Sequence, residues 1–175
     1  TITTDFILEL YHQFELLEYP EISRPTAQKT INWMKRWNSG LNPRIVRIRE
    51  ENKERIIRLL MARIENRQRG KYVFPEGSSY MAKFNMVEKW WDDHHFHLTM
   101  AARKPSELNL MLNNSLSEET MKLLKEARKK GIPTFATPYY LSLLDTTDKS
   151  YNDLAIRNYV IYSRKLVDTF GNIVA

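Results

Sequence analysis

Five side chains that could bind a metal ion follow directly after a pair of tryptophans. They are Asp92, Asp93, His94, His95 and His97. Imidazole and carboxylate groups are common metal ligands in proteins. No two of these histidines have the i, i+4 spacing that would put them on one face of a helix, although His95 and His97 could share a face of a strand. We therefore predict no metal site in this block.

The rest of the sequence shows no arrangement of residues that is typical of a catalytic or cofactor site. The order of residues suggests no Ser/His/Asp or Cys/His triad, no glycine-rich phosphate loop and no pair of carboxylates on a shared face. The chain has no cysteine, which excludes disulfides and thiolate metal sites within these residues. We predict no catalytic and no cofactor-binding residue, so the chain alone is not expected to be an enzyme.

A long segment from residue 44 to residue 69 is rich in basic side chains. It holds nine basic residues and four glutamates, while the formal net charge of the whole chain is +6. This pattern could be a basic face for nucleic acid or an acidic protein partner. The glutamates are interleaved with the basic residues, and Glu51 with Arg55 and Glu54 with Arg58 have the favourable i, i+4 order. We expect a solvated helix face with ion pairs and keep the binding module as the alternative.

Residues 131–157 form the segment whose residue choices are most specific. Thr137 followed by Pro138 predicts a helix start, because the hydroxyl can accept a bond from a free backbone N–H and proline loses no bond there. The apolar run after it, which includes Tyr139 and Tyr140, favours burial on several sides. The turn formers at 145–148 then end the run. Without further information this is a short core helix followed by a surface loop.

The string TPYYLSLLD at 137–145 resembles a segment of the radical SAM amino-acid 2,3-aminomutases, the lysine 2,3-aminomutase family. As in that family, a second aspartate (Asp148) and an arginine follow. The block at 90–96, WWDDHHF, is similar to the family's W-x-D-W-x-W block, and LSEE at 116–119 is similar to the helix start between the two. The resemblance covers roughly Trp90 to Arg157, under half of the chain.

This resemblance implies a function for a longer parent polypeptide. Relatives use S-adenosylmethionine, a 4Fe–4S cluster and pyridoxal phosphate, and the protein supplies positioning and electrostatics. The chain begins without methionine and stops in an apolar run. We therefore expect an N-terminal helical piece of a cytoplasmic isomerase, with the cluster-binding cysteines elsewhere in the parent. Its expected partners are the radical SAM barrel of the parent, an amino-acid substrate and further copies in a homo-oligomer.

The resemblance also implies substrate-binding residues. It places Arg157 near the carboxylate of the substrate, a role that suits a planar guanidinium able to form two parallel hydrogen bonds. The alternative is a surface or ion-paired arginine. Tyr139 and Tyr140 could line the pocket, or they could be core residues. Members that act on lysine carry an arginine just before T-P-Y-Y, and residues 132–136 contain none, so no particular amino acid is predicted.

The elements that must position these residues are helical. Helical spacing and capping residues predict helices over residues 5–18, about 25–40, 43–70, 105–110 and 138–144. Three further helices have two possible starts each: Ser78 or Ser79 for the helix to residue 91, Ser115 or Ser117 for the helix to Gly131, and Asn152 or Asp153 for the helix to Gly171. The fold class is mostly α, an irregular array of about seven helices with little or no β structure. We predict an N-terminal helical arm at 1–78 and a family-like region at 79–175. No apolar run approaches the ~18 residues of a membrane span, and no signal peptide opens the chain.

Overall fold

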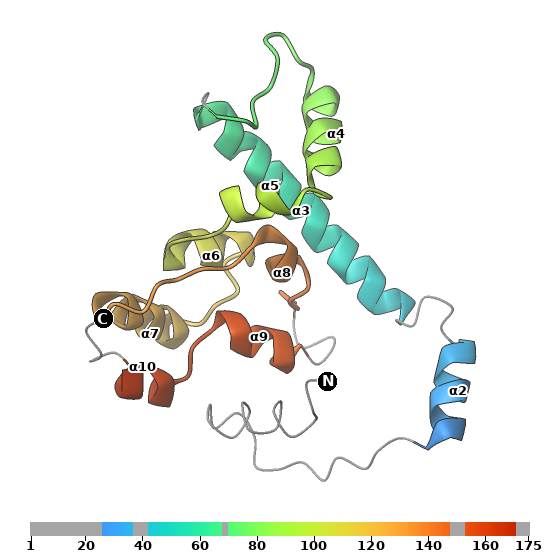
Figure 1. Ribbon diagram of the computed structural model, residues 1–175, viewed down its shortest axis with the longest axis vertical. Coiled ribbons are helices and arrows are strands. Elements are labelled where there is room, and N and C mark those ends of the chain that lie inside the picture. Colours follow the sequence, from blue (N-terminus) through green and yellow to red (C-terminus); the bar gives the residue numbers. More distant parts are fainter. Residues whose placement is uncertain (1–25, 37–41, 68–69, 148–152, 171–175) are drawn as a thin grey trace.

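The computed structural model describes residues 26–36, 42–67, 70–147 and 153–170 of the chain (Figure 1). Within these ranges the fold is mostly α, as predicted, and the only β-type pairing is an isolated antiparallel bridge between Ala102 and Ala136. The helices are α2 (Ala27–Arg36), α3 (Pro43–Arg67), α4 (Tyr80–Trp90), α5 (His94–Thr99), α6 (Pro105–Met111), α7 (Glu118–Lys129), α8 (Pro138–Ser142), α9 (Leu154–Val160) and α10 (Arg164–Phe170).

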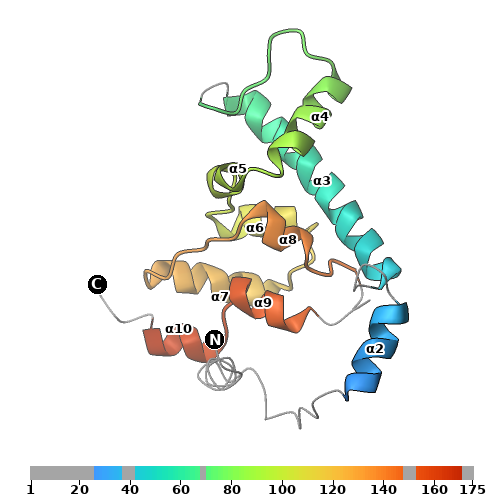
Figure 2. The same cartoon turned by 45° about the vertical axis from the view of Figure 1, so that its right-hand side comes forward.

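The long helix α3 is the central element of the fold. It packs against α4 along its C-terminal half and against α8 nearer its middle, while α6, α7, α9 and α10 lie on the α8 side (Figures 1 and 2). Its buried side chains recur with helical spacing: Ile56, Ile57, Leu60, Met61 and Ile64. The expected boundary at 78/79 falls between α3 and α4, two helices that share this core. No helix in the described residues is long and apolar enough to cross a membrane.

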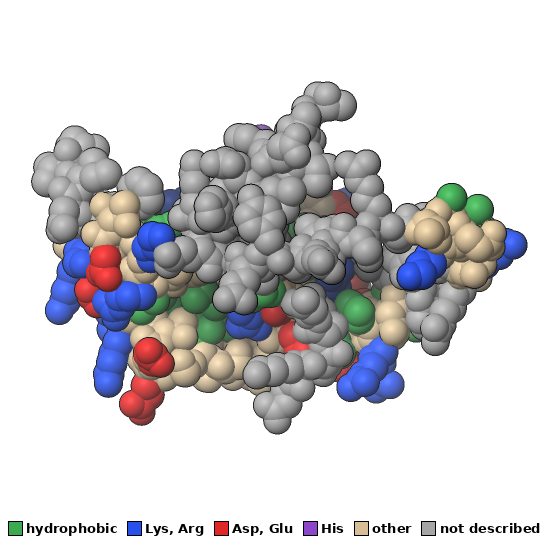
Figure 3. All heavy atoms as spheres, turned by 90° about the horizontal axis from the view of Figure 1, so that it is seen from below, with side chains coloured by type: hydrophobic (Ala, Val, Ile, Leu, Met, Phe, Trp, Pro, Cys, Tyr) green, Lys and Arg blue, Asp and Glu red, His purple; other side chains and the backbone are tan. Residues whose placement is uncertain are grey.

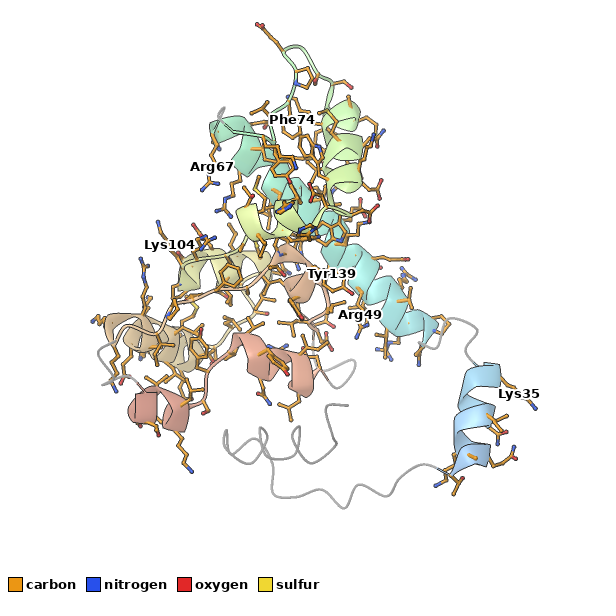
Figure 4. All side chains as sticks on the ribbon, viewed as in Figure 1. Lys35, Arg49, Arg67, Phe74, Lys104 and Tyr139 are labelled. Carbon is orange, nitrogen blue, oxygen red and sulfur yellow. The ribbon has the colours of Figure 1, made fainter. Side chains whose placement is uncertain are left out.

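An aromatic cluster closes the end of the core between α3, α4 and α5. The Phe96 ring is fully buried and lies edge-on to Tyr72, with 5.0 Å between ring centroids. Trp90 lies 5.9 Å from Phe96 and stacks on Phe74 at 5.7 Å. Phe74 is seen between α3 and α4 in Figure 4. Offset and edge-on contacts of this kind are the favoured geometries of aromatic pairs.

Several helix ends lie where the capping residues predicted them. The hydroxyls of Ser79, Ser117 and Thr137 accept bonds from the backbone N–H groups three residues later. Gly131 follows α7 at φ +89°, a left-handed conformation that glycine adopts without a steric penalty. There the N–H of Ile132 donates to the carbonyl of Ala127 at 2.9 Å, which completes a Schellman motif.

Two parts of the helix prediction differ from the structure. Residues 94–99, for which helix and strand were both left open, form the short helix α5, whose start is capped by Asp93. The single helix predicted for 153–171 is divided into α9 and α10. Ile161 is extended, and the hydroxyl of Ser163 accepts a bond from the N–H of Leu166 at 3.2 Å, which starts a new helix. The predicted helix at 5–18 lies outside the described residues.

Candidate functional site

Arg157 is held in a two-pronged ion pair within its own helix. Its Nε donates to Oδ1 of Asp153 at 3.0 Å, and its Nη2 donates to Oδ2 of the same carboxylate at 2.7 Å. Nη2 also donates to the backbone carbonyl of Asp145 at 2.7 Å. Of the five N–H donors of a guanidinium, the pair on Nη1 has no partner among the described residues. The structure therefore brings Arg157 to the end of the TPYYLSLLD segment and leaves one nitrogen available.

The residues after α8 fold back on themselves through Asp145. Its side chain is 5% exposed, and its Oδ1 accepts bonds from the N–H and the hydroxyl of Thr147 at 2.9 and 2.8 Å. Its backbone N–H donates to Oδ2 of Asp153 at 2.8 Å. Asp153 is the N-cap residue of α9, but its side chain makes no capping bond and binds Arg157 and the Asp145 backbone instead. This arrangement fixes the start of α9 against the end of α8.

Asn52 of α3 holds the same turn from the other side. It is 4% exposed, and its Nδ2 donates to the carbonyl of Leu144 at 2.8 Å and to that of Ser142 at 3.4 Å. Its Oδ1 accepts from the hydroxyl of Thr146 at 3.1 Å. These carbonyls lie at the C-terminal end of α8, where a helix leaves its acceptors unsatisfied. We call Asn52, Asp145, Thr146, Thr147, Asp153 and Arg157 the polar joint.

Two arginines of α3 perform the same task at other helix ends. Nη1 of Arg55 donates to the carbonyl of Met111, the last residue of α6, at 2.7 Å. Nη1 of Arg63 donates to the carbonyl of Met100, which ends α5, at 3.2 Å. Burial lowers the pKa of both guanidiniums, although arginine remains charged at working pH. Thus α3 places polar side chains at the C-terminal ends of three short helices.

The other basic residues of α3 are partly paired. Arg47 bonds to Glu51 at 2.9 Å, Arg58 binds Glu54, and Lys53 lies 3.7 Å from Glu88 of α4. On the face seen in Figure 3, basic side chains at the α7–α10 end stand beside acidic ones. This agrees with the ion pairs that join Glu126 and Asp168 to basic partners across these helices. The pairs made by Arg47, Lys53 and Arg58 fit the ion-paired face that was predicted for residues 44–69.

Tyr139 and Tyr140 begin α8, at the end opposite the polar joint. Each is 49% exposed, and their ring centroids are 6.0 Å apart. Tyr139 also lies 6.0 Å from the ring of His97, where α5 and α8 meet α3 (Figure 4). Arg157 contacts the chain beyond the other end of this helix, through the Asp145 carbonyl. The three predicted substrate-binding residues therefore flank α8 from its two ends.

The acidic and histidine block at 92–97 is used for packing and capping. Asp93 accepts from the His95 N–H at 2.9 Å, the Tyr72 hydroxyl at 2.6 Å and the Lys71 ammonium at 3.1 Å. The Tyr72 hydroxyl is the main reason that the pKa of Asp93 is well below its usual range. In the described parts of the chain, no group of three or more His, Cys, Asp or Glu side chains converges on a possible metal position.

His97 is buried on one side of this block. Its Nε2 lies 2.6 Å from the carbonyl of Trp91, so the neutral ring carries its proton there. Nδ1 is enclosed and finds no partner among the described residues. Burial lowers the pKa of His97 below 6.5, against a smaller opposing effect of the Trp91 carbonyl and the Asp93 and Asp92 carboxylates. The ring packs on Trp91 and Tyr139 as a neutral group.

Two shallow pockets lie away from the polar joint. One, of about 420 Å³, is lined by residues that include Arg67, Lys71 and His95. The other, of about 470 Å³, lies beside Lys125 and Arg128. Neither is lined by any of the three predicted substrate-binding residues. The candidate site consists of the polar joint and the two exposed tyrosines, whose positions are fixed by hydrogen bonds and ring contacts.

The polar joint is suited to positioning rather than to proton transfer. Its carboxylates accept several hydrogen bonds each, and its single guanidinium is already paired, so every charge has a partner. The Nη1 group of Arg157 is the donor of the polar joint that remains for binding an anionic group. The chain has no cysteine, so it supplies no thiolate for an iron–sulfur cluster.

Comparison with known proteins gives one informative similarity. The chain is 28% identical over 140 residues to a protein of Methanocaldococcus jannaschii described as an uncharacterized KamA family protein. The match covers 78% of this chain but 20% of that protein, so the chain spans about a fifth of the length of this curated relative. No family model matches the chain. No solved structure matches it.

Sequence reasoning missed the role of Asn52. A signal for it is present, because residue 52 lies four positions before Ile56 and eight before Leu60, on the buried face of α3. A lone amide on an apolar stripe needs partners, and the nearest unsatisfied groups are the carbonyls at a helix end. The pairing of Arg157 with Asp153 was the alternative already stated for that arginine, and the i, i+4 spacing favours it.

Proposed function

We propose that this chain is a helical region of a radical SAM, pyridoxal-phosphate-dependent isomerase related to the amino-acid 2,3-aminomutases. The observation that carries this proposal is the 28% identity over 140 residues to a KamA family protein. The TPYYLSLLD segment lends further support. The cluster, S-adenosylmethionine and pyridoxal phosphate would be bound by the rest of the parent polypeptide. This chain contributes a scaffold, subunit contacts and part of the substrate pocket.

Within that enzyme, the proposed task of the polar joint is to orient Arg157. Asp153 occupies the Nε and Nη2 side of the guanidinium, and Asn52 holds the turn whose carbonyl also accepts from Nη2. The Nη1 end is then left for the carboxylate of an amino-acid substrate, a charge-assisted contact. Tyr139 and Tyr140 would form the wall of the pocket at the other end of α8. The aspartates stabilise the guanidinium and take no part in the reaction.

The family assignment is tested by the parent polypeptide. We expect its sequence to contain a C-x-x-x-C-x-x-C run, and the protein purified without oxygen to contain about four irons per cluster site. Replacing these cysteines by serine should remove the iron. A parent without clustered cysteines, or one that binds no iron after anaerobic reconstitution, contradicts the proposal.

The role of Arg157 is tested separately by Arg157→Lys in the parent. Binding of a set of L-amino acids should weaken by about 10-fold to 100-fold, because a charged hydrogen bond is worth roughly 1.5–3 kcal/mol. The melting temperature should change little, since lysine can still pair with Asp153. Arg128→Lys on the exposed side of α7 is the matched control. Equal losses of binding and stability would mean that Arg157 is structural.

A further inference from the structure

An exposed apolar strip, which we call the α5–α8 patch, lies at the end of α8 opposite the polar joint. Its large side chains are each between 43% and 49% exposed: Leu98, Phe135, Tyr139 and Tyr140. Large apolar side chains are common singly on protein surfaces, but a connected group of them marks a contact site.

Contacts between neighbours join these residues or the segments that carry them. The rings of Tyr139 and Tyr140 touch, and Tyr139 contacts His97, which precedes Leu98 on α5. Arg103 completes the connection. Its Nη2 donates to the Leu98 carbonyl at 3.4 Å, and its guanidinium lies 5.2 Å from the Phe135 ring centroid. The patch therefore runs from the start of α8 to the residues before α6.

The patch rests on a rigid support. The bridge between Ala102 and Ala136 ties the two segments together, with N–H···O distances of 2.8 and 3.2 Å. Both alanines are buried, as are Pro138 and Leu141 of α8. An aromatic side chain contributes 150–250 Å² when fully buried, so these half-exposed groups offer on the order of 300–400 Å² of apolar surface. That is the size of patch that is often functional on a folded domain.

We propose that the α5–α8 patch is the surface on which the remaining part of the parent polypeptide docks. This inference rests on the proposed function, since it requires that a parent exists. The matched residues make up 20% of the KamA family protein, so four-fifths of that protein lies outside the matched region and could supply the docking surface. An interface of this kind places exposed aromatics at its centre.

The charge at the Phe135 end of the patch argues against a second copy as the occupant. There the Arg103 guanidinium lies over the Phe135 ring, and Glu107 accepts a bond from the backbone N–H of Arg103 at 2.9 Å. Carboxylates of Asp92 and Asp93 act on His97 at the other end. A two-fold contact centred on the Phe135 end would bring Arg103 close to its own copy, where like charges repel. The surface that docks is therefore expected to be apolar, with a carboxylate or backbone carbonyls opposite Arg103.

Hydroxyl-radical labelling of the parent, read by mass spectrometry, measures this directly. Tyr80 and Met81 are internal controls, because they are 54% and 62% exposed on α4, away from the patch. After correction for intrinsic reactivity, Leu98, Phe135, Tyr139 and Tyr140 should react at least about five times more slowly than the two controls. The protection should be the same across a hundredfold range of protein concentration, because docking within one chain is unimolecular.

Two outcomes overturn the proposal. One is labelling of the patch at the rate of the controls. The other is protection that appears only as the concentration rises, which would assign the patch to a second copy. Phe135→Glu should increase labelling of Tyr139 several-fold in the parent, whereas Met81→Glu should leave it unchanged. If the parent contains an iron–sulfur cluster but the patch is exposed, the docking proposal is wrong and the proposed function stands. If the parent has no cysteine but the patch is protected, the proposed function is wrong and the docking proposal stands.

Discussion

Two regions of α3 are stabilised in different ways. Towards its C-terminal end, the buried contacts with α4 and α5 are mainly apolar and include the ring cluster around Phe96, while polar bonds such as those of Arg63 to the Met100 carbonyl and of Lys83 to Glu65 lie beside them. Near residue 52, contacts with α8 and α9 pass through the polar joint, where Asn52 and Asp145 are 4% and 5% exposed. The first region depends on filling space, and the second depends on satisfying particular donors and acceptors.

This difference predicts different responses to substitution. Apolar packing is roughly proportional to the surface buried, so its loss grows with the atoms removed. A buried polar network loses stability whenever one partner is deleted, even if the volume is kept, because the remaining groups stay buried without partners. The loss of stability should therefore follow the volume removed in the apolar region and the number of partners lost in the polar joint.

The largest effect is expected from Phe96→Ala. Its ring is 0% exposed and contacts Tyr72 and Trp90, so removing it leaves a cavity and should lower the free energy of unfolding by about 3–5 kcal/mol. Denaturant unfolding of the chain, followed by circular dichroism, measures this value. Phe135→Ala, at a ring that is 43% exposed, is the control and should cost less than about 1 kcal/mol. Equal losses would show that the ring cluster is not the centre of this region.

Asn52→Leu is expected to have the next largest effect, although it nearly preserves volume. It removes the donor for the Leu144 carbonyl and the acceptor for the Thr146 hydroxyl, and should cost about 2–3 kcal/mol. Asn66→Leu, at an exposed position of the same helix, is the matched control. If Asn52→Leu were neutral or stabilising, the polar joint would behave like the apolar region and the comparison would fail.

The extent to which the sequence predicted the fold follows from the same distinction. Helix starts at Ser79, Ser117 and Thr137 and the stop at Gly131 depend on bonds within a few residues. Local patterns therefore fixed Thr137 and Gly131 and narrowed each of the other two starts to two serines. The division between α9 and α10 was missed. There, Ser163 starts a new helix inside a run that keeps helical spacing, and periodicity alone does not reveal such a break.

The candidate site was harder to predict because its partners are distant in sequence. Asn52 lies 90 or more positions from Ser142, Leu144 and Thr146, which it contacts. No pattern within a single helix identifies such partners. The Asp153–Arg157 pair is local, and its spacing did favour an ion-paired arginine as the alternative to a substrate ligand. Whether Arg157 also meets a substrate depends on groups outside this chain, and it stays a prediction.

His97 is a titratable group inside the apolar region, so the stability of that region should depend on pH. Its pKa is lowered by burial, so between that value and the ordinary value of 6.5 the unfolded chain binds more protons than the folded chain. Its contribution to stability is complete above about pH 6.5 and is lost as the pH falls towards the folded pKa. A single proton limits the slope to about 1.4 kcal/mol per pH unit.

The measurement is the free energy of unfolding between pH 7.5 and pH 5 for the chain and for His97→Gln. The variant should show a smaller loss of stability on acidification, because glutamine does not titrate. His94→Gln, at an exposed histidine, controls for the change in composition. If His97→Gln steepened the pH dependence, a protonated His97 would have to be stabilised in the folded chain.

The smallest effect is expected from Arg47→Ala. It breaks the ion pair with Glu51, which lies on the exposed face of α3 outside both regions. The side chains of Arg47 and Glu51 are 81% and 60% exposed, and exposed pairs of this kind contribute less than about 0.5 kcal/mol. Arg55→Ala provides the contrast, because it leaves the Met111 carbonyl at the end of α6 without its partner and should cost about 1–3 kcal/mol.

The same pair of variants tests the alternative function. If the 44–69 face binds nucleic acid, Arg47→Ala should weaken that binding and reduce its salt dependence, because an exposed arginine is the kind that contacts phosphate. If α3 is a scaffold, Arg47→Ala should leave both stability and any weak DNA binding unchanged. Only Arg55→Ala, at the half-buried arginine, should then lower the free energy of unfolding.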